Sequence, residues 1–278
     1  MKNILVVQDI SCFGKCSTTV ALPIISHFKL TASILPTAIL STHTGPDFPG
    51  YVMTDLSQHM RATIAHWKKL GLQFDAVYTG YLGNASHIDL LIEALPYLLK
   101  DQGLLFVDPV FADQGEFYAG FDASYVEAQS DLIAISDYLL PNYTEACLLT
   151  GQDFSHDDPS PLAIKSLLES LQAMGTKNAI VTGIHRGQEI GAVMLGQDQK
   201  VYQSFAPYVD QMFSGTGDVF ASVFVGECMQ EKILSAQAVL DQSVTFVYQA
   251  IQATLSDSDP INYGIHFEHV LNGLSSSQ

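Results

Sequence analysis

Short apolar segments rich in β-branched residues alternate along the chain with longer segments whose apolar residues recur at helical spacing. Because the short segments are continuously apolar, they predict parallel strands that are buried on both faces. Their alternation with helices predicts a three-layer α/β fold, in which a mostly parallel sheet carries helices on both faces. The predicted strands are 4–8, 33–40, 76–79, 104–107, 138–140, 179–182, 190–195 and 201–205, and the predicted helices are 17–28, 52–70, 85–100, 123–130, 144–150, 161–174, 216–230, 235–255 and 263–271.

One pair of predicted strands, 190–195 and 201–205, departs from this alternation. The residues that join them, Gly196-Gln197-Asp198-Gln199, are too few for a crossover helix, so the pair predicts an antiparallel hairpin at an edge of the sheet. Neither a fixed-period repeat nor a change of composition divides the chain. Residues 1–278 are therefore expected to form a single domain.

The charge balance limits the classes of partner. The chain has 29 acidic residues against 12 basic ones, which gives a formal net charge of −17. Nucleic acids and anionic membrane surfaces are bound by clustered Lys and Arg, so this balance argues against both. No Lys or Arg lies between Lys200 and Lys232. A phosphate bound in that stretch would be held by backbone amides and bound metal ions.

The cysteines and the apolar runs indicate the cellular compartment of the protein. Cys12, Cys16, Cys147 and Cys228 form no Cys-x-x-Cys pair, which favours free thiols in a reducing compartment over disulfides or zinc. Cys12 is expected to be a buried, inert thiol. The N-terminal apolar run is too short for a signal peptide, and no run reaches the length of a membrane span. We expect a cytoplasmic protein.

The segment Phe213-Ser214-Gly215-Thr216-Gly217-Asp218 leads into a predicted helix. A glycine-rich turn that enters a helix leaves backbone N–H groups unpaired at the positive end of the helix dipole, which makes an anion site. Asp218 suits such a site if it takes the proton of a hydroxyl that attacks a bound phosphoryl group. A simple turn with a helix cap would give the same residues, so the motif alone leaves both interpretations open.

Small, polar and acidic residues follow the predicted strands, at the edge where open parallel sheets bind their ligands. Turn formation explains some of them, since Gly, Asp, Asn and Pro favour turns. Carboxylates that lack a partner nearby in the sequence are harder to explain in that way. The strand-end segments are Asp9, Ser41-Thr42-His43-Thr44-Gly45, Gly80-Tyr81-Leu82-Gly83, Asp108-Pro109, Pro141-Asn142-Tyr143-Thr144-Glu145 and Thr182-Gly183.

The first strand–helix junction excludes two common nucleotide-binding motifs. A Rossmann dinucleotide site requires Gly-x-Gly-x-x-Gly, whereas residues 9–14 read Asp-Ile-Ser-Cys-Phe-Gly. A P-loop requires Gly-x-x-x-x-Gly-Lys followed by Ser or Thr. Here Asp9 stands at the position of the first glycine, and Cys16 follows Gly14-Lys15.

Five short motifs carry a family resemblance: Asp108-Pro109-Val110, Pro141-Asn142 with Glu145, Gly215-Thr216-Gly217-Asp218, Ser41-Thr42-His43-Thr44-Gly45 and Gly80-Tyr81-Leu82-Gly83. The first three together resemble the ribokinase-like superfamily of small-molecule kinases. The last two are similar to the pyridoxal (vitamin B6) kinases within it, and the resemblance runs from Lys2 to about residue 255. It implies ATP and Mg²⁺, commonly a monovalent cation such as K⁺, and a homodimer.

The resemblance also implies a role for each matching residue. Asp218 would deprotonate the 5′-hydroxymethyl group of the vitamer, and the amides of Gly215, Thr216 and Gly217 would hold the γ-phosphoryl. The other implied roles fall into three groups: substrate binding by Asp9, His43, Thr44, Gly45, Tyr81 and Asp218 itself; nucleotide binding by Asp108, Asn142, Glu145, Thr182, Ala206, Pro207, Tyr208 and Val209; and cation binding by Asp108 and Glu145.

Three places depart from the pattern of the pyridoxal kinases. Gln8-Asp9-Ile10 stands where a serine in a Gln-Ser-His context is expected. An aspartate there could accept from a phenolic OH or a pyridinium N–H, and it changes the preferred protonation state of the ring, so the preferred vitamer stays open. Cys12-Phe13-Gly14-Lys15 is unlike the usual form, and Thr182-Gly183 stands where some members carry a lysine on the ATP side.

Other functions and some details stay open at this point. A hydroxymethylpyrimidine or sugar kinase of the same superfamily is one alternative, and a non-enzymatic vitamer-binding protein is the other. Thr44 with Tyr81 favours an aromatic ring over a sugar, and the intact 215–218 motif favours an enzyme. The Gly- and Pro-containing segment 41–51 could close over the substrate. The residues expected to be solvated at the surface are Lys15, Arg186, His266 and His269.

Overall fold

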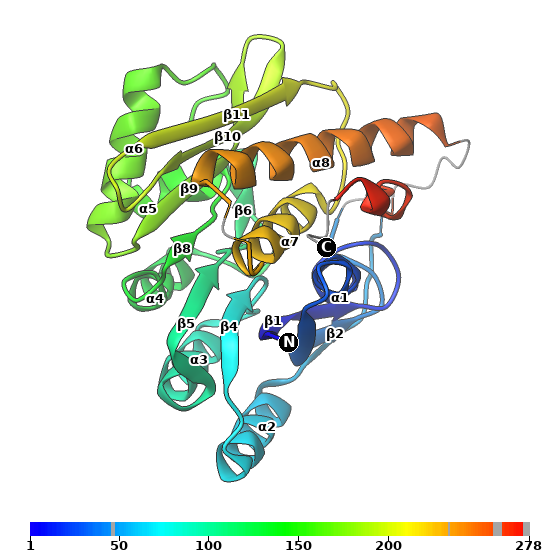
Figure 1. Ribbon diagram of the computed structural model, residues 1–278, viewed down its shortest axis with the longest axis vertical. Helices are drawn as coiled ribbons and strands as arrows, with labels where there is room; N and C mark the ends of the chain where they lie inside the picture. Colours follow the sequence, from blue (N-terminus) through cyan, green and yellow to red (C-terminus); the bar gives the residue numbers. More distant parts are fainter. Residues whose placement is uncertain (46–47, 233, 258–262, 275–278) are drawn as a thin grey trace.

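The computed structural model describes residues 1–45, 48–232, 234–257 and 263–274. Their central sheet has the strand order β11-β10-β9-β8-β5-β4-β1-β2-β3 (Figure 1). The six strands from β9 to β2 in this order are parallel, and β10, β11 and β3 add antiparallel edges. The strands are β1 Asn3–Ser11, β2 Thr31–Leu40, β3 Met53–Asp55, β4 Phe74–Thr79, β5 Leu99–Val107, β8 Tyr138–Leu139, β9 Asn178–Arg186, β10 Glu189–Leu195 and β11 Val201–Pro207.

Helices cover both faces of the sheet and bury one apolar core on each. Successive residues of β1 alternate between the two cores: Ile4 and Val6 belong to one, and Leu5 and Val7 to the other. The three-layer, mostly parallel fold and the edge hairpin β10–β11 are therefore confirmed. One face carries α1 Thr18–His27, α7 Thr216–Cys228 and α8 Ala236–Ser256, and the other carries α2 Ser57–Leu70, α3 Ala85–Leu98, α4 Ala123–Ile133, α5 Tyr143–Thr150 and α6 Pro161–Ala173 (Figure 1).

Two predicted helices differ from the structure. Residues 53–55 of the predicted helix 52–70 form the edge strand β3 against β2. The helix starts only at Ser57, whose backbone N–H donates to the Asp55 carboxylate. The predicted helix 263–271 is wrong: Gly264 has a φ of 120°, and two short 3₁₀ turns, Phe267–His269 and Leu271–Gly273, replace it. Residues 258–262 lie outside the described part of the chain.

The path of the chain defines the edge where a ligand would bind. From β1 the chain runs outward to β2, then crosses back to β4 on the other side of β1 and continues toward β9. The direction of winding therefore reverses between β1 and β4, and open α/β sheets bind ligands at the carboxyl ends of the strands at such a point. Within the described residues no helix is both long and apolar enough to span a bilayer.

Candidate active site

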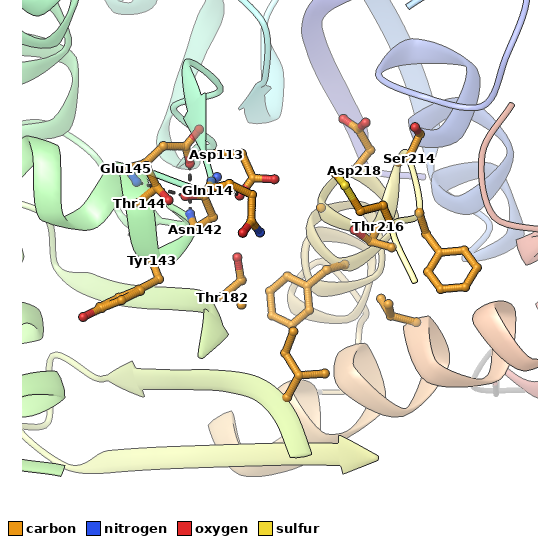
Figure 2. A pocket seen from close by; sticks show the side chains of 18 of the residues that line it. Asp113, Gln114, Asn142, Tyr143, Thr144, Glu145, Thr182, Ser214, Thr216 and Asp218 are labelled. Carbon is orange, nitrogen blue, oxygen red and sulfur yellow. Dashed lines mark hydrogen bonds between the residues drawn. The ribbon is translucent and has the colours of Figure 1, made fainter. Parts of the chain in front are cut away.

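A cleft of about 750 Å³ opens at the carboxyl ends of the strands. All the site residues that the sequence predicts line it, including Asp9 from the end of β1, Tyr81 after β4, Asp108 after β5 and Asp218 on α7. Figure 2 shows Ser214, Thr216 and Asp218 facing Asn142, Thr144 and Glu145 across this cleft. None of the described residues that line the cleft is a Lys or Arg. The fold thus assembles an acidic site from segments far apart in the sequence.

The first turn of α7 is built for close approach of a ligand. Its N-cap, Gly215, has a left-handed φ of 79°, and a Cβ there would come within 2.2 Å of the Lys15 carbonyl oxygen. Glycine is therefore required by both conformation and space. Gly217 differs, because a Cβ added to it would meet no atom within 4 Å. The backbone at Gly217 borders the open cleft, and the N–H groups of this first turn have no acceptor within the helix.

Asp218 sits at the start of α7 with its carboxylate in the cleft. Burial raises its pKa to about 7, the nearby charge of Asp9 adds to the rise, and the backbone N–H of Ser17 opposes it. A carboxylate with a pKa near neutrality is suited to general-base catalysis, because it accepts a proton readily yet is largely ionised at physiological pH. The sequence predicted Asp218 as the base, and that role stays a prediction.

Ser17 is a site residue that the sequence did not predict. Its side chain lowers the pKa of Asp9 and its backbone N–H lowers the pKa of Asp218, so Ser17 lies beside two carboxylates of the cleft. It does so from a φ of 50°, which is strained for a residue with a Cβ. Nothing in the sequence around Ser17 signals this conformation.

Asp9 is buried at the end of β1. Its carboxylate accepts a hydrogen bond from Ser11 Oγ at 3.1 Å, and burial raises its pKa. The group is therefore easier to protonate than an ordinary aspartate, and in that state it could donate a hydrogen bond to a ligand as well as accept one.

The loops after β2 and β4 form one wall of the cleft. Tyr81 lines it, with its carbonyl held by Thr37 Oγ1 at 2.8 Å and its ring edge-to-face with Phe121. The imidazole Nδ1 of His43 accepts from the Gly45 N–H at 3.0 Å, and a Cβ on Gly45 would lie 2.7 Å from that ring. Gly45 thus allows His43 to fold back on its own loop. Thr44 lines the cleft beside them.

Asp108 is a buried carboxylate without a direct partner. It lies at the end of β5, is 8% exposed, and accepts no hydrogen bond from the described residues. Burial and the charges of Glu145 and Asp218 raise its pKa well above the usual range. An unpaired buried carboxylate is costly unless a cation binds to it.

Glu145 has several partners within the protein. Its carboxylate accepts from the backbone N–H groups of Phe111 at 2.9 Å, Ala112 at 3.3 Å and Asn142 at 2.9 Å. The last of these is half of a capping box, since the Asn142 side chain accepts from the Glu145 N–H in return. Burial still raises the pKa of Glu145 to about 8. Glu145 thus ties α5 to the hairpin formed by β6 Ala112–Asp113 and β7 Glu116–Phe117, which the sequence did not predict.

The remaining predicted nucleotide residues line the far half of the cleft. Thr182 forms an isolated parallel β-bridge with Asn142, and the Thr182 N–H donates to the Pro141 carbonyl at 3.0 Å. Ala206-Pro207-Tyr208-Val209 ends β11, where the Tyr208 ring packs against His185. Apolar residues of α8 complete this half, although the sequence gave them no role: Val244, Val247, Tyr248 and Ile251.

Some sequence expectations outside the predicted site need correction. Cys12 is exposed, not buried. His266 is 5% exposed, since the 3₁₀ segment folds onto α8, whereas His269 is exposed as expected. The Lys15 ammonium is only partly solvated and pairs with Glu268 at 2.8 Å, while Arg186 is an exposed partner of Glu189.

A preformed metal centre of protein ligands is not evident in the described residues, where no group of three or more His, Cys, Asp or Glu side chains is arranged to hold an ion. The carboxylates of Glu145 and Asp9 already accept hydrogen bonds from the protein, so Asp108 has no second unpartnered carboxylate from these two residues to share an ion with. An ion at this site would share its coordination with a bound phosphate or with water.

Comparisons with known proteins identify the family of this fold and site. A family model described as phosphomethylpyrimidine kinase matches residues 54–263. A putative phosphomethylpyrimidine kinase from Bacteroides thetaiotaomicron, crystallised with pyridoxal, is 33% identical with a TM-score of 0.91, and the match covers 98% of this chain and 95% of that one. Pyridoxal kinase from Lactobacillus plantarum is 30% identical with a TM-score of 0.89, over 98% and 96% of the two chains.

A curated relative agrees with these structures. Pyridoxal kinase from Dictyostelium discoideum is 24% identical over 91% of this chain and 86% of its own length. The family match covers most of the chain, and the solved structures reproduce the whole fold. The chain therefore belongs to the phosphomethylpyrimidine kinase family and, within the ribokinase-like superfamily, to the pyridoxal kinases.

Proposed function

We propose that the protein transfers the γ-phosphoryl group of ATP to the 5′-hydroxymethyl oxygen of a vitamin B6 vitamer, in B6 salvage. The observation that carries this proposal is the first turn of α7, where the Asp218 carboxylate, with a pKa raised to about 7, stands beside open backbone at Gly217. Relatives that are pyridoxal kinases, and a related structure with pyridoxal, support the choice of substrate.

The chemistry follows from the positions of these groups. Asp218 takes the proton of the 5′-hydroxyl as its oxygen attacks the γ-phosphorus, a new O–P bond forms, and the bond from that phosphorus to the β–γ bridging oxygen breaks to release ADP. The N–H groups of Gly215, Thr216 and Gly217 meet the charge on the transferring phosphoryl oxygens. Phosphoryl transfer depends mainly on positioning and charge neutralisation, and these are what the turn supplies.

The vitamer ring is assigned to the wall formed by Asp9, His43, Thr44, Gly45 and Tyr81. Asp9 and Thr44 offer polar contacts to the ring, and Tyr81 offers an aromatic face. Because burial raises the pKa of Asp9, it could meet the ring either as a donor or as an acceptor. The nucleotide is assigned to the opposite half, from Asn142 and Thr182 to Ala206–Val209.

The residues present fit a magnesium ion. Asp108 is buried, unpartnered and open to the cleft, and Mg²⁺ is usually held by one or two carboxylates together with substrate phosphates. We propose that Asp108 holds the ion directly and that Glu145 lies on the same, cation-binding side of the cleft. When bound, the ion supplies charge neutralisation that the cleft lacks. A monovalent cation and a homodimer, which the family resemblance implies, remain predictions.

Nucleotide binding should depend strongly on the divalent ion. The cleft is lined by seven acidic residues (Asp9, Asp108, Asp113, Glu145, Asp157, Asp158 and Asp218) and by no Lys or Arg among the described residues. Removing the ion would leave the polyphosphate facing this charge, so we expect the Kd of ADP to rise at least about tenfold in EDTA. Isothermal titration with and without Mg²⁺ measures this. Equal affinity in both buffers would show that another group neutralises the phosphates.

Activity should fall as the pH drops below neutrality. Asp218 must be ionised to accept the proton, and its pKa is raised to about 7. The value of kcat/KM, which reports the free enzyme, is expected to be level above about pH 8 and to fall about tenfold per unit below pH 6. A pH–rate profile at saturating Mg²⁺ checks this. A profile that stays level down to pH 5 would mean that Asp218 has an ordinary pKa or is not the base.

The proposal is tested by ATP turnover with a panel of acceptors: pyridoxal, pyridoxine, pyridoxamine, hydroxymethylpyrimidine and ribose. We expect turnover with at least one B6 vitamer and a far lower kcat/KM for the pyrimidine and the sugar. A 29% identical relative, hydroxymethylpyrimidine/phosphomethylpyrimidine kinase from Bacillus subtilis, makes the pyrimidine the necessary comparison. Turnover with the pyrimidine alone would keep the fold and reject the substrate. Tight vitamer binding without turnover would indicate a binding protein.

A further inference from the structure

A cluster of buried polar side chains lies directly beneath the catalytic turn, between α7 and the sheet. Gln8 on β1, Tyr78 on β4 and Ser222 on α7 are all 0% exposed. Their polar atoms, Gln8 Oε1 and Nε2, Tyr78 OH and Ser222 Oγ, make no direct hydrogen bond of normal geometry within the described residues. Buried polar groups are almost always satisfied, so four such atoms in one place call for an explanation.

The strand register brings these groups to one place. Val6 pairs with Tyr78 and Tyr78 with Phe106, and all three point to the face that α7 covers. Gln8 and Asp108 lie two residues further along their strands, so their side chains point to the same face. Gly80 continues β4 between them, donating its N–H to Val7 while Asp108 donates to Thr79.

Gly80 makes room for the Gln8 side chain. A Cβ on Gly80 would lie 2.8 Å from both Gln8 Cγ and Nε2, so the amide occupies the space that another side chain would take. This explains in packing terms why a glycine stands first in the Gly80-Tyr81-Leu82-Gly83 motif.

The cluster lies next to the carboxylates of Asp108 and Asp218. Ser222 lies one helical turn after Asp218, at the i+4 position on the same face of α7. The Tyr78 hydroxyl lies close to Ser222 and Gln8. Burial, together with the charges of Asp108 and Asp218, raises its pKa well above the usual value. Tyr78 therefore stays protonated and acts as a donor. Other titratable groups near Asp218 are Asp9 from β1 and Cys16 before α1, and Glu227 lies at the far end of α7.

We propose that Gln8, Tyr78 and Ser222 form a built site for ordered water, and that Tyr78 is a positioning residue that fixes the Asp108 and Asp218 carboxylates through this water. Water suits the cluster because it can accept from the Tyr78 O–H and the Gln8 N–H groups while it donates to a carboxylate. A cation suits it less, because the Gln8 amide N–H groups and the Tyr78 O–H would point toward it. The kinetic part of this inference rests on the proposed function, whereas the water site itself does not.

The first test is a crystal structure of the unliganded protein at a resolution that shows ordered water. We expect at least one well-defined water within hydrogen-bond distance of Tyr78 OH and of Ser222 Oγ or the Gln8 amide. Direct hydrogen bonds among the three side chains, with no density between them, would overturn the water site whatever the protein phosphorylates.

The second test is Tyr78→Phe, which keeps the ring and removes only the hydroxyl. Loss of one buried donor to a charged network should lower kcat about tenfold and leave the KM values for ATP and vitamer within about twofold. The matched control is Tyr138→Phe, a ring that also packs on α7 but whose hydroxyl faces Cys228. Its kcat should not change. Equal effects of the two variants would show that Tyr78 acts only by packing.

Ser222→Ala provides a second, smaller change in the same cluster. It should also lower kcat, and the double variant with Tyr78→Phe should lose less than the product of the two single effects, because both side chains bind the same water. Independent, fully multiplicative effects would contradict a shared water. If no acceptor is phosphorylated at all, the proposed function fails while the crystallographic test still decides the water site.

Discussion

Asp218→Asn is expected to lower kcat by about 10²- to 10⁴-fold while the protein remains folded and still binds vitamer and nucleotide. The amide has the size of the carboxylate but cannot accept the hydroxyl proton. Because the N–H groups of the first turn of α7 stay in place, KM should change little, and the loss should appear in kcat. Steady-state kinetics with the preferred vitamer measure kcat and KM separately. Activity within tenfold of the wild type would contradict the role of Asp218 as base.

The same substitution should make the protein more stable at alkaline pH. The folded pKa of Asp218 is raised from 3.8 to about 7, so folding favours the protonated form. The contribution of protonated Asp218 to the stability of the fold is complete below about pH 4 and is lost as the pH rises through 7. Above that pH the ionised carboxylate destabilises the folded state, whereas asparagine stays neutral. At pH 8 we expect a gain of about 1–3 kcal/mol, or a Tm higher by several degrees, because Asp218 still faces the open cleft.

Glu227→Gln is the matched control on the same helix. Glu227 is 3% exposed, and burial raises its pKa to about 7, as for Asp218, but it lies at the far end of α7, away from the cleft. Because the Gln242 amide donates to the Glu227 carboxylate, the variant should gain less stability at pH 8 than Asp218→Asn, and it should keep the wild-type kcat. A large loss of activity in Glu227→Gln would show that any change of charge on α7 disturbs the site.

Gly215→Ala and Gly217→Ala should have opposite effects on stability although they lie two residues apart. At Gly215 a methyl group meets the Lys15 carbonyl at 2.2 Å and the φ is 79°, so the turn must distort, at a cost of about 2–4 kcal/mol. At Gly217 the methyl meets no atom within 4 Å, and alanine should stabilise the helix by up to about 1 kcal/mol. Thermal unfolding of the two variants measures the difference.

Gly217→Ala should nevertheless impair catalysis. Its methyl group would enter the open space where the transferring phosphoryl is proposed to approach the backbone. We expect a well-folded protein whose kcat/KM for ATP falls by about 10²-fold or more, as after loss of one oxyanion-hole donor. A fully active Gly217→Ala variant would mean that the phosphoryl group does not approach this turn.

The fold could be predicted where one pattern dominated, and the exceptions have local causes. Continuous apolar runs such as 4–7 specify buried parallel strands whatever surrounds them. In contrast, Met53–Asp55 became an edge strand because β2 offered free backbone groups, which helical spacing in the sequence cannot reveal. The segment after Tyr263 failed to form a helix because Gly264 adopts a φ that a helix does not allow.

The candidate site was predictable because strand ends of a parallel sheet must meet at one edge. Asp9 and Asp108 reach the same cleft for that reason, whereas Asp218 reaches it from the first turn of α7. The sequence could not show which side chains of the cleft already have hydrogen-bond partners within the protein. Asn142 and Glu145 fit a capping-box pattern that was present in the sequence, whereas the strained backbone of Ser17 and the cluster beneath Asp218 depend on contacts between distant segments.

The most direct test of the central claim is to determine where the phosphate goes. The purified protein is incubated with Mg-ATP and pyridoxal, and the product is examined by phosphorus NMR with proton coupling. We expect a phosphomonoester coupled to the two 5′-methylene protons, formed by the wild type and by Glu227→Gln but at least about 10²-fold more slowly by Asp218→Asn. Inorganic phosphate alone, or a phosphate on another oxygen of the vitamer, would contradict it.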